Sequence, residues 1–529
     1  MTNRKSTKRA LLGSVMAMVL CLAMLVGATF AWFTDTASTG VNKIQAGKLD
    51  VALEMKEGDS WVSAEGKTLN WVKAAAGEQV LWEPGCTYTL PELRVVNNGN
   101  LALKYKIQIT GIQGDAKLNE VIDWTINDAA IDLTEGHLTA GQQGDAFTIK
   151  GHMKETAGND YQNLTIDGIG ITVYATQDTV EYDSFNNTYD ANAQYPAMPY
   201  VTSHEALNTN LTLADIPTNE ATGKHDPVEV TLGNTEAGDI AYSEHSSGYT
   251  GKGVMLGSTK LNSYAAAPAK AGEYTFVFKN GTINSAAKGY SSIDNLKDTS
   301  VYMLVPGNSD VVFENMTFNG VVSFDIQMYT SPWSYLHSIT FKNCTFNGIV
   351  VGSCPAEKAT FDGCTFNNYT NTTYANNSNP IWWRAGTGYW GTGADESVHS
   401  LKEFTFVNNN VTSTRPVKIE RIGWNCTAGI TILDNTFDIS KQAGDSETKN
   451  MAINIGQRDN TSKFILTDDG NTISAGTASL YTAALGSGSN QYVAVSGSKV
   501  LDRNGNDKVI TAMVWKTTTG ETFDMKTID

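Results

Sequence analysis

The residues best suited to recognising a ligand are aromatic side chains in the second half of this 529-residue chain. Residues 381–390 hold IWWR and YW within a Gly-rich stretch, and further Trp residues lie in separate segments. Aromatic faces stack on sugar rings, and exposed Trp is enriched at binding surfaces. The alternative is that this stretch, an inserted loop, folds back and buries its own rings. We predict a surface for a glycan or a cell-surface partner formed by Trp333, Trp382, Trp383, Tyr389, Trp390 and Trp424.

A second cluster suits acid–base chemistry. Arg415, Lys418, Glu420 and Arg421 fall within seven residues of each other. Glycoside hydrolysis requires paired carboxylates, and elimination requires a positioned base. Acids rarely recur in adjacent copies of the repeat described below, so a salt-bridged outer strand is the simpler interpretation. We predict that the protein is not an enzyme and assign no catalytic residue; a polysaccharide lyase or hydrolase is the alternative.

Metal-binding patterns are absent from the sequence. No two of the seven His lie within five residues of each other, and H-E-x-x-H does not occur. Cys344 and Cys364 share one repeat position, which favours stacked interior thiols rather than a reactive pair. Residues 502–507 match a calcium loop only in part and favour a hairpin turn, while Asp468-Asp469 favours a solvated turn. We therefore expect no metal and no cofactor.

The first 31 residues form a secretion signal. Residues 10–26 are uncharged, they follow a basic start, and small residues lead to Ala31. We predict cleavage between Ala31 and Trp32 by a signal peptidase during export; an uncleaved membrane anchor is the alternative. The formal charge of −17 becomes −21 (−17 − 4) without the basic residues of the signal, and this charge repels nucleic acid. Those basic residues are Arg4, Lys5, Lys8 and Arg9.

The composition after the signal predicts an all-β protein with more than one domain. The length exceeds what one core supports, and Thr-rich strands alternate with Asn- and Gly-rich turns. Apolar residues alternate with polar ones over 101–109 and 169–176, as in strands with one buried face. Turn signals lie at 83–85 and 97–100. Short alternating strands with such turns predict a β-sandwich.

The N-terminal third resembles the TasA/camelysin family. The matching segments are GATFAWFTD at 27–35, AGKLDV at 46–51, WEPG at 82–85 and VVNNGNLA at 95–102. The resemblance implies a jelly-roll sandwich over 32–180 and export from a Gram-positive-type bacterium to its surface or biofilm matrix. It also implies fibres in which the segment starting at Trp32 and Phe33 adds as a strand to a neighbouring copy. The alternative is that Trp32 and Phe33 fold back onto their own sandwich. Some camelysins are classed as metallopeptidases, but the scattered His residues give that activity no support here.

A degenerate repeat dominates residues 201–529. FENMTFN at 313–319 recurs as FKNCTFN at 341–347 and FDGCTFN at 361–367, with looser copies at 278–284, 406–412 and 432–438. Each copy predicts a strand, a bend at an Asn or Gly, and a second strand. One such rung cannot bury its apolar side, so the rungs must stack into a coil, with loops inserted in some turns. Each buried Phe contributes roughly 1.5–3 kcal/mol.

This pattern resembles the right-handed parallel β-helix of the pectate-lyase-like proteins, which implies a fold and leaves function open. Residues 181–200 read as a linker, and a short helix with Ser203 as N-cap begins the second domain. We predict an all-β chain with a jelly-roll-like β-sandwich followed by this β-helix. Its expected role is structural or adhesive, outside the cell, as a homo-oligomer or fibre.

Overall fold

The computed structural model describes residues 48–529 apart from gaps. The signal, the cleavage site at Ala31 and Trp32, and Phe33 lie outside the described residues. The gaps of three residues or more are 73–79, 132–134, 179–192, 220–222, 242–249, 263–268, 286–299, 327–334, 353–355, 368–378, 385–400, 423–426, 440–450, 458–462, 483–498, 509–513, 517–521 and 525–529.

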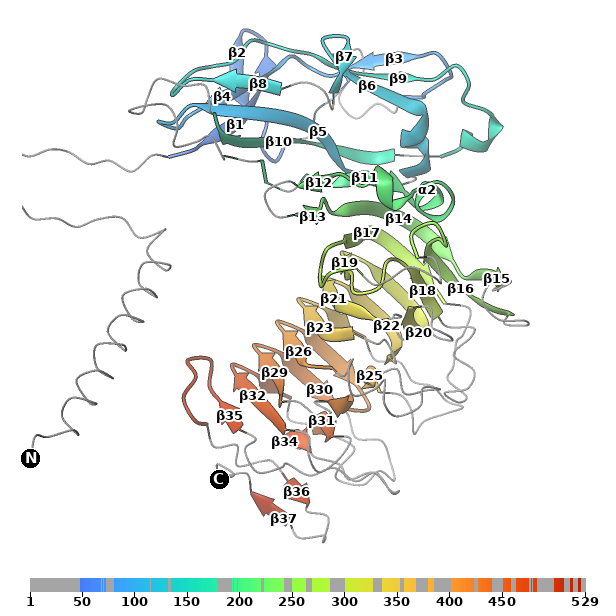
Figure 1. The fold of residues 1–529 in the computed structure, drawn as a ribbon, viewed down its shortest axis with the longest axis vertical. Coiled ribbons are helices and arrows are strands. Elements are labelled where there is room, and N and C mark those ends of the chain that lie inside the picture. The colour runs from blue at the N-terminus through green and yellow to red at the C-terminus, as the bar shows by residue number, and fades with distance from the viewer. Residues whose placement is uncertain are drawn as a thin grey trace, which may run out of the picture. The chain divides into compact units, whose positions relative to one another are not determined.

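The N-terminal part of the described chain forms three small antiparallel sheets around a shared apolar core. The first sheet has the order β2-β1-β4, the second β10-β5-β8 and the third β3-β9-β6-β7 (Figure 1). Leu93, Leu103 and Ile149 are fully buried among them. The strands are β1 Val51–Glu57, β2 Ser60–Ser63, β3 Thr87–Thr89, β4 Leu93–Asn97, β5 Leu103–Gly114, β6 Ile122–Ile126, β7 Ala129–Ala130, β8 Glu135–Leu138, β9 Ile149–Met153 and β10 Ile166–Gln177.

The strands and turns predicted in this part are confirmed. β10 contains the alternating segment 169–176, and β5, which begins at Leu103, contains most of the segment 101–109. The two strands pair antiparallel with Val173 opposite Ile107. Gly85 has a φ of +85°, and the Cys86 amide donates to the Glu83 carbonyl at 2.9 Å, so a turn closes there. At the second turn, the Gly99 amide donates to Asn97 Oδ1 at 2.9 Å. The side chain thus holds a bend that the backbone alone would leave open.

The predicted cap helix is also confirmed. The helix α2 runs over His204–Thr209, after the strand β11 Tyr200–Ser203. Ser203 is its N-cap, and its hydroxyl accepts a hydrogen bond from the Ala206 amide at 3.0 Å. Leu207 of this helix is fully buried and begins the apolar core of the second half of the chain.

The second half of the chain is a coil of stacked strands, whose pairings between rungs are parallel (Figure 1). We call its three rows of strands the first, second and third faces. The first face comprises β14 Val228–Glu236, β17 Thr275–Asn284, β19 Asp310–Glu314, β21 Leu336–Lys342, β23 Ala356–Asp362, β26 Glu403–Val407, β29 Thr427–Leu433, β32 Lys463–Asp469 and β35 Lys499–Leu501.

The second face continues from the ends of β14 and β17 into β20 Thr317–Ile326, β22 Thr345–Gly352, β24 Thr365–Phe366, β27 Asn410–Ser413, β30 Thr436–Ile439 and β33 Thr472–Ile473. The third face contains β16 Thr250–Gly257, β18 Ser300–Leu304, the later parts of β20 and β22, β25 Ile381–Arg384, β28 Val417–Ile422, β31 Met451–Gln457, β34 Ser479–Thr482 and β36 Val514–Lys516. Short additional strands are β12 Thr218–Asn219, β13 Lys224–His225, β15 Gly238–Ala241 and β37 Thr522–Asp524.

The rung register follows the sequence repeat. Phe278 pairs with Phe313, Phe313 with Phe341, Phe341 with Phe361, and Phe361 with Phe406. These five rings are fully buried, and Phe341 stacks on Phe361 with centroids 4.7 Å apart. Identical side chains therefore repeat along the coil axis, and each ring is covered by those above and below it.

The bend between the first and second faces uses the left-handed backbone conformation. Asn tolerates that conformation better than most side chains, which explains why it occupies the bend in four of the six copies, while Gly363 and Asp434 occupy it in the other two. The bend residues predicted in the sequence are confirmed. Their φ values are +54° at Asn280, +53° at Asn315, +51° at Asn343, +66° at Gly363, +57° at Asn408 and +56° at Asp434.

The described chain is mostly β, with small antiparallel sheets in its N-terminal part and a long parallel sheet consistent with a β-helix. No helix among the described residues is long and apolar enough to cross a membrane.

Candidate functional site

The strand β10 forms a long open edge in the N-terminal part. It runs for 12 residues, and among the described strands it pairs with β5 alone. The other edge strands described in these three sheets have two to five residues, and β4 is bridged to Gln143 and Phe147. A long edge strand leaves a row of main-chain donors and acceptors available to another strand.

The apolar core is incomplete beside this edge. Ile171, Val173 and Ala175 of β10 point into the core but remain half-buried. Their neighbours on β5, Ile109 and Ile107, are almost fully buried. On β1, Val51 and Leu53 are also half-buried, and the nearby Leu49 is 40% exposed. Apolar surface is thus left uncovered where an additional strand would complete the core.

Only part of β10 is regular. Its register against β5 shifts between Ile166 and Gly168 and again between Gly168 and Gly170. Bulges of this kind twist an edge away from further pairing. The segment from Ile171 to Gln177 pairs without a shift. The candidate acceptor is therefore this seven-residue segment of β10.

The opposite side of the β10–β5 pair is already used within the chain. Burial raises the pKa of Tyr174 on β10, and the carboxylate of Glu229 on β14 raises it further. Glu229 is buried and pairs with Lys279 Nζ at 2.6 Å. Gln108 Nε2 on β5 donates to the Pro199 carbonyl at 2.6 Å. The edge of β10, and the side of this strand that faces the apolar core, remain available to a partner.

The prediction that Trp383 belongs to an aromatic binding surface is wrong. Residues 381–384 form the strand β25 of the coil, so they are not in an inserted loop. Alternation along this strand turns Trp383 into the coil interior, where it is fully buried. Its ring packs against Phe361 with centroids 5.7 Å apart. Trp383 therefore has no face to offer a ligand.

Trp382 points to the outside of the third face and is half-buried. Lys418, its register neighbour on β28, holds Nζ 4.7 Å from the centre of the Trp382 ring. A cation over the ring competes with a sugar for the same surface. The other predicted aromatic residues, Trp333, Tyr389, Trp390 and Trp424, lie outside the described residues.

The cluster that suited acid–base chemistry is spread over two environments. Arg415 is buried at the corner before β28, and its Nη1 donates to the Thr414 carbonyl at 2.8 Å. Lys418 points outward to Trp382. The side chains of Glu420 and Arg421 lie outside the described residues. The described members therefore do not converge on one reacting position.

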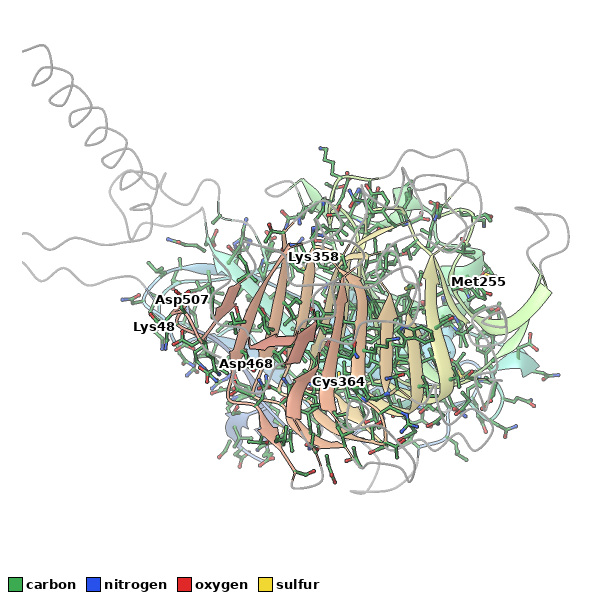
Figure 2. The ribbon with its side chains drawn as sticks, turned by 90° about the horizontal axis from the view of Figure 1, so that it is seen from below. Lys48, Met255, Lys358, Cys364, Asp468 and Asp507 are labelled. Carbon is green, nitrogen blue, oxygen red and sulfur yellow. The ribbon has the colours of Figure 1, made fainter. Side chains whose placement is uncertain are left out.

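Carboxylates on the first face are paired with bases. Glu357 contacts Lys402 at 2.6 Å, and Glu403 contacts Lys358, a residue labelled in Figure 2, at 3.1 Å. Asp310 accepts from Ser338 and lies 2.7 Å from His337 Nδ1. Asp434 and Asp469 both contact the guanidinium of Arg503, at 2.7 and 3.0 Å. Carboxylates bonded in this way support the fold.

The described His residues do not form a metal centre. They contact different partners: His137 contacts Asp178, His152 contacts Thr87, His204 contacts Met255, His225 contacts Ile216 and His337 contacts Asp310. No group of three or more His, Cys, Asp or Glu in the described part of the chain is arranged to hold a metal ion. The described His residues therefore do not fit a zinc site.

Of the two predictions made for acidic segments, one is confirmed and the other is wrong. Residues 502–507 form the predicted hairpin turn, in which the Asp502 carboxylate accepts from the Asn504 and Asn506 amides. The prediction of a solvated turn at Asp468-Asp469 is wrong, because both residues belong to β32. Asp468 is buried and pairs with Lys508 Nζ at 2.7 Å. Buried charge of this kind requires a partner, which Lys508 supplies.

The two thiols that were predicted to stack contribute to the interior of the coil. Cys344 and Cys364 are free, buried and at equivalent positions of neighbouring rungs, as predicted. Burial raises the pKa of the Cys364 thiol, and its contact with Cys344 raises it further. A thiol whose pKa is raised by burial carries little thiolate and reacts slowly. In later rungs Asn409 and Asn435 take the same position and bond to each other.

The fold thus defines a class, a β-rich scaffold with small antiparallel sheets and a long parallel sheet, in which β10 is an edge strand of the described part. A family model described as camelysin metallo-endopeptidase matches residues 6–58, which cover most of the predicted signal, the segment that starts at Trp32, and β1. Proteins of the camelysin/TasA family are typically secreted. Comparisons with curated proteins and with solved structures find no match.

Proposed function

We propose that this chain is an exported structural protein of the bacterial surface or extracellular matrix that assembles by strand addition. Residues 32–45 of one copy, starting at Trp32 and Phe33, add to Ile171–Gln177 of another. The half-buried apolar row on the open edge of β10 supports this proposal most directly. The family match at residues 6–58 supports it independently.

The proposal includes the finer predictions made from the sequence. Signal peptidase cleaves between Ala31 and Trp32 and so creates an aromatic N-terminus. A jelly-roll-like sandwich over 32–180 carries the acceptor edge, and residues 181–200 link it to a right-handed β-helix over 201–529. The helix acts as a rigid scaffold and not as an enzyme, and neither a metal nor a cofactor takes part.

Strand addition explains the two unusual features of β10 together. Main-chain hydrogen bonds from a donor satisfy the open edge, and alternate donor side chains cover Ile171, Val173 and Ala175. Each large apolar side chain that the donor buries contributes roughly 1.5–3 kcal/mol. An intramolecular version, in which Trp32 and Phe33 cover their own sandwich, uses the same contacts and gives a monomer.

Electron microscopy of the mature protein tests the proposal. Full-length protein is expected to form filaments, and protein without residues 32–45 is expected to remain as single particles. Val173→Lys is expected to abolish the filaments. Val62→Lys is the matched control, because Val62 is a half-buried Val on the edge strand β2 of the same core and is expected to leave filaments intact. Single particles in every sample would overturn the proposal.

Glycan binding is the second candidate function. The neighbouring strands β20, β22, β25 and β28 run parallel in the third face. The chain continues from the ends of β20, β25 and β28 to Trp333, to Tyr389 and Trp390, and to Trp424. The three segments that carry these aromatic residues therefore all follow strands of the third face. Pull-down with insoluble polysaccharides, compared between the wild type and Trp390→Ala, tests the candidate, and equal retention would reject it.

A further inference from the structure

The outer surface of the second face repeats the same two uncharged side chains. On β20, β22 and β24, a Thr and the Asn two positions later point outward on either side of a buried Phe. We call this surface the Thr–Asn face and define it by Thr317, Asn319, Thr345, Asn347, Thr365 and Asn367. Asn347 and Asn367 are exposed, and the other four residues are half-exposed.

The Asn side chains of this face bond to each other along the coil axis. Asn367 Nδ2 donates to Asn347 Oδ1 at 2.5 Å, Asn347 to Asn319 at 2.9 Å, and Asn319 to Asn284 at 2.8 Å. Each amide in the row therefore has a fixed orientation, and one N–H remains for a bond outside the row. The row is a preorganised lattice with the spacing of parallel strands, about 4.8 Å.

The other two faces of the coil differ from it. On the first face, Lys279, Glu314, Lys342 and Asp362 follow each other in register, so charge alternates along that surface. On the third face, the outward side chains Tyr302, Ser323 and Asn454 are already buried. Among the described residues, the Thr–Asn face thus combines exposure with absence of charge over three rungs.

We propose that the Thr–Asn face is a lateral contact between two copies of this chain. In-register strands with identical, uncharged side chains and Asn rows are the surfaces that pair sheet against sheet in stacked β assemblies. An acidic protein with a charge of −17 is repelled by its own copies, and a contact through this uncharged face brings the fewest like charges together.

The size of the face sets the strength of the contact. The uncharged surface continues over five rungs, from Thr282 to Thr412, before the exposed Asp438 follows on β30. It extends over roughly 19 Å at the spacing of parallel strands, and two side-chain rows are about 10 Å wide. Two such faces bury roughly 400 Å² in total, below the ~1,200 Å² typical of a stable complex. Single copies therefore associate weakly, and filaments built by strand addition associate side by side through many repeated contacts. This consequence for filaments rests on the proposed function.

Disulfide trapping in the mature protein tests the proposal. Asn347→Cys places a thiol on the Thr–Asn face, and Lys342→Cys places one on the first face of the same rung; both positions are exposed. On mild oxidation with oxidised glutathione, two thiols from different copies join as one disulfide while the oxidant is reduced to two thiols. N347C is expected to give covalent dimers at least tenfold faster than K342C. Added salt is expected to speed the trapping of N347C, because it screens the repulsion between acidic copies.

Thr345→Lys in the N347C background is the second variant, and it is expected to abolish trapping while leaving the thermal unfolding midpoint unchanged. Equal trapping at 342 and 347, or trapping that survives Thr345→Lys, would overturn the proposal. Protection of N347C from a maleimide by added neutral polysaccharide, without dimer formation, would assign the face to a carbohydrate and also overturn it. Deleting residues 32–45 separates the two proposals, since it removes filaments but leaves the trapping rate at high protein concentration unchanged.

Discussion

The coil and the N-terminal sheets cover their apolar side chains by different means. In the coil, each Phe of the ladder is covered by the same residue of the next rung, so Phe313, Phe341 and Phe361 are fully buried. In the N-terminal sheets, Val173 and Ile171 of β10 remain half-buried beside an open edge. Stacking covers the coil from within the chain, whereas the described strands of the N-terminal sheets leave these side chains half-buried.

The first prediction compares the two cores directly. Phe341→Ala is expected to destabilise the coil by roughly 3–5 kcal/mol, because neighbouring rungs cannot collapse into the cavity. Val173→Ala is expected to cost about 1 kcal/mol or less in the unassembled protein, since its side chain is already half-exposed. Chemical denaturation of both variants measures the difference. Equal costs would show that the two cores are closed to the same degree.

The second prediction concerns the Asn row inside the coil. Asn435 accepts from the Asn409 amide and donates to the Phe406 carbonyl, and both partners are buried. Asn435→Ala is expected to cost roughly 2–4 kcal/mol, because each buried group that loses its partner costs about 1–3 kcal/mol. Asn347→Ala in the exposed row is the control and should cost less than about 1 kcal/mol, since water replaces the lost bonds. A comparable loss in both thermal unfolding curves would contradict the distinction between the two rows.

The third prediction tests the bends. Asn343 has a φ of +51°, a conformation that costs an ordinary side chain about 1–2 kcal/mol. Asn343→Ala should therefore destabilise the coil by about 1 kcal/mol, and Asn343→Gly should be nearly neutral. Urea unfolding of both variants distinguishes a backbone requirement from a side-chain one. Equal losses for Gly and Ala would show that the Asn side chain, and not the bend, is what matters.

The smallest effect is expected at the start of the coil. Burial lowers the pKa of His204, and its hydrogen bond to the Met255 carbonyl opposes that shift only in part. The folded state therefore favours neutral His204. This stability is complete above the unfolded pKa of about 6.5 and is lost as the pH falls from there towards the lowered folded value. His204→Gln should flatten the thermal stability profile between pH 7.5 and 5, and an unchanged profile would reject the assignment.

The repeat made the coil predictable from the sequence. A Phe, an Asn bend and a second Phe recur with the same spacing, so both the register of Phe313 against Phe341 and the left-handed Asn343 follow from local pattern alone. The Ser203 cap was predictable for the same reason, since the cap depends on residues within one turn.

The candidate site was less predictable, because it depends on β10 having a single partner among the described strands. Alternation identified Ile171 and Val173 as core residues, but only the order of strands shows that β10 has a single partner. Trp383 was misassigned because its neighbours are Gly-rich, while its orientation depends on the pairing of β25 with β22 and β28. Asp468 was misassigned because its partner Lys508 is 40 residues away.

Hydrogen exchange of β10 tests the central claim most directly. Backbone amides of Ile171–Gln177 that do not face β5 are predicted to exchange quickly in protein lacking residues 32–45, and to become protected by at least 100-fold (about 2.7 kcal/mol) in the assembled full-length protein. Amides of β5, which lies between two strands, should be protected in both samples. Equal protection of Ile171–Gln177 with and without residues 32–45 would contradict strand addition at this edge.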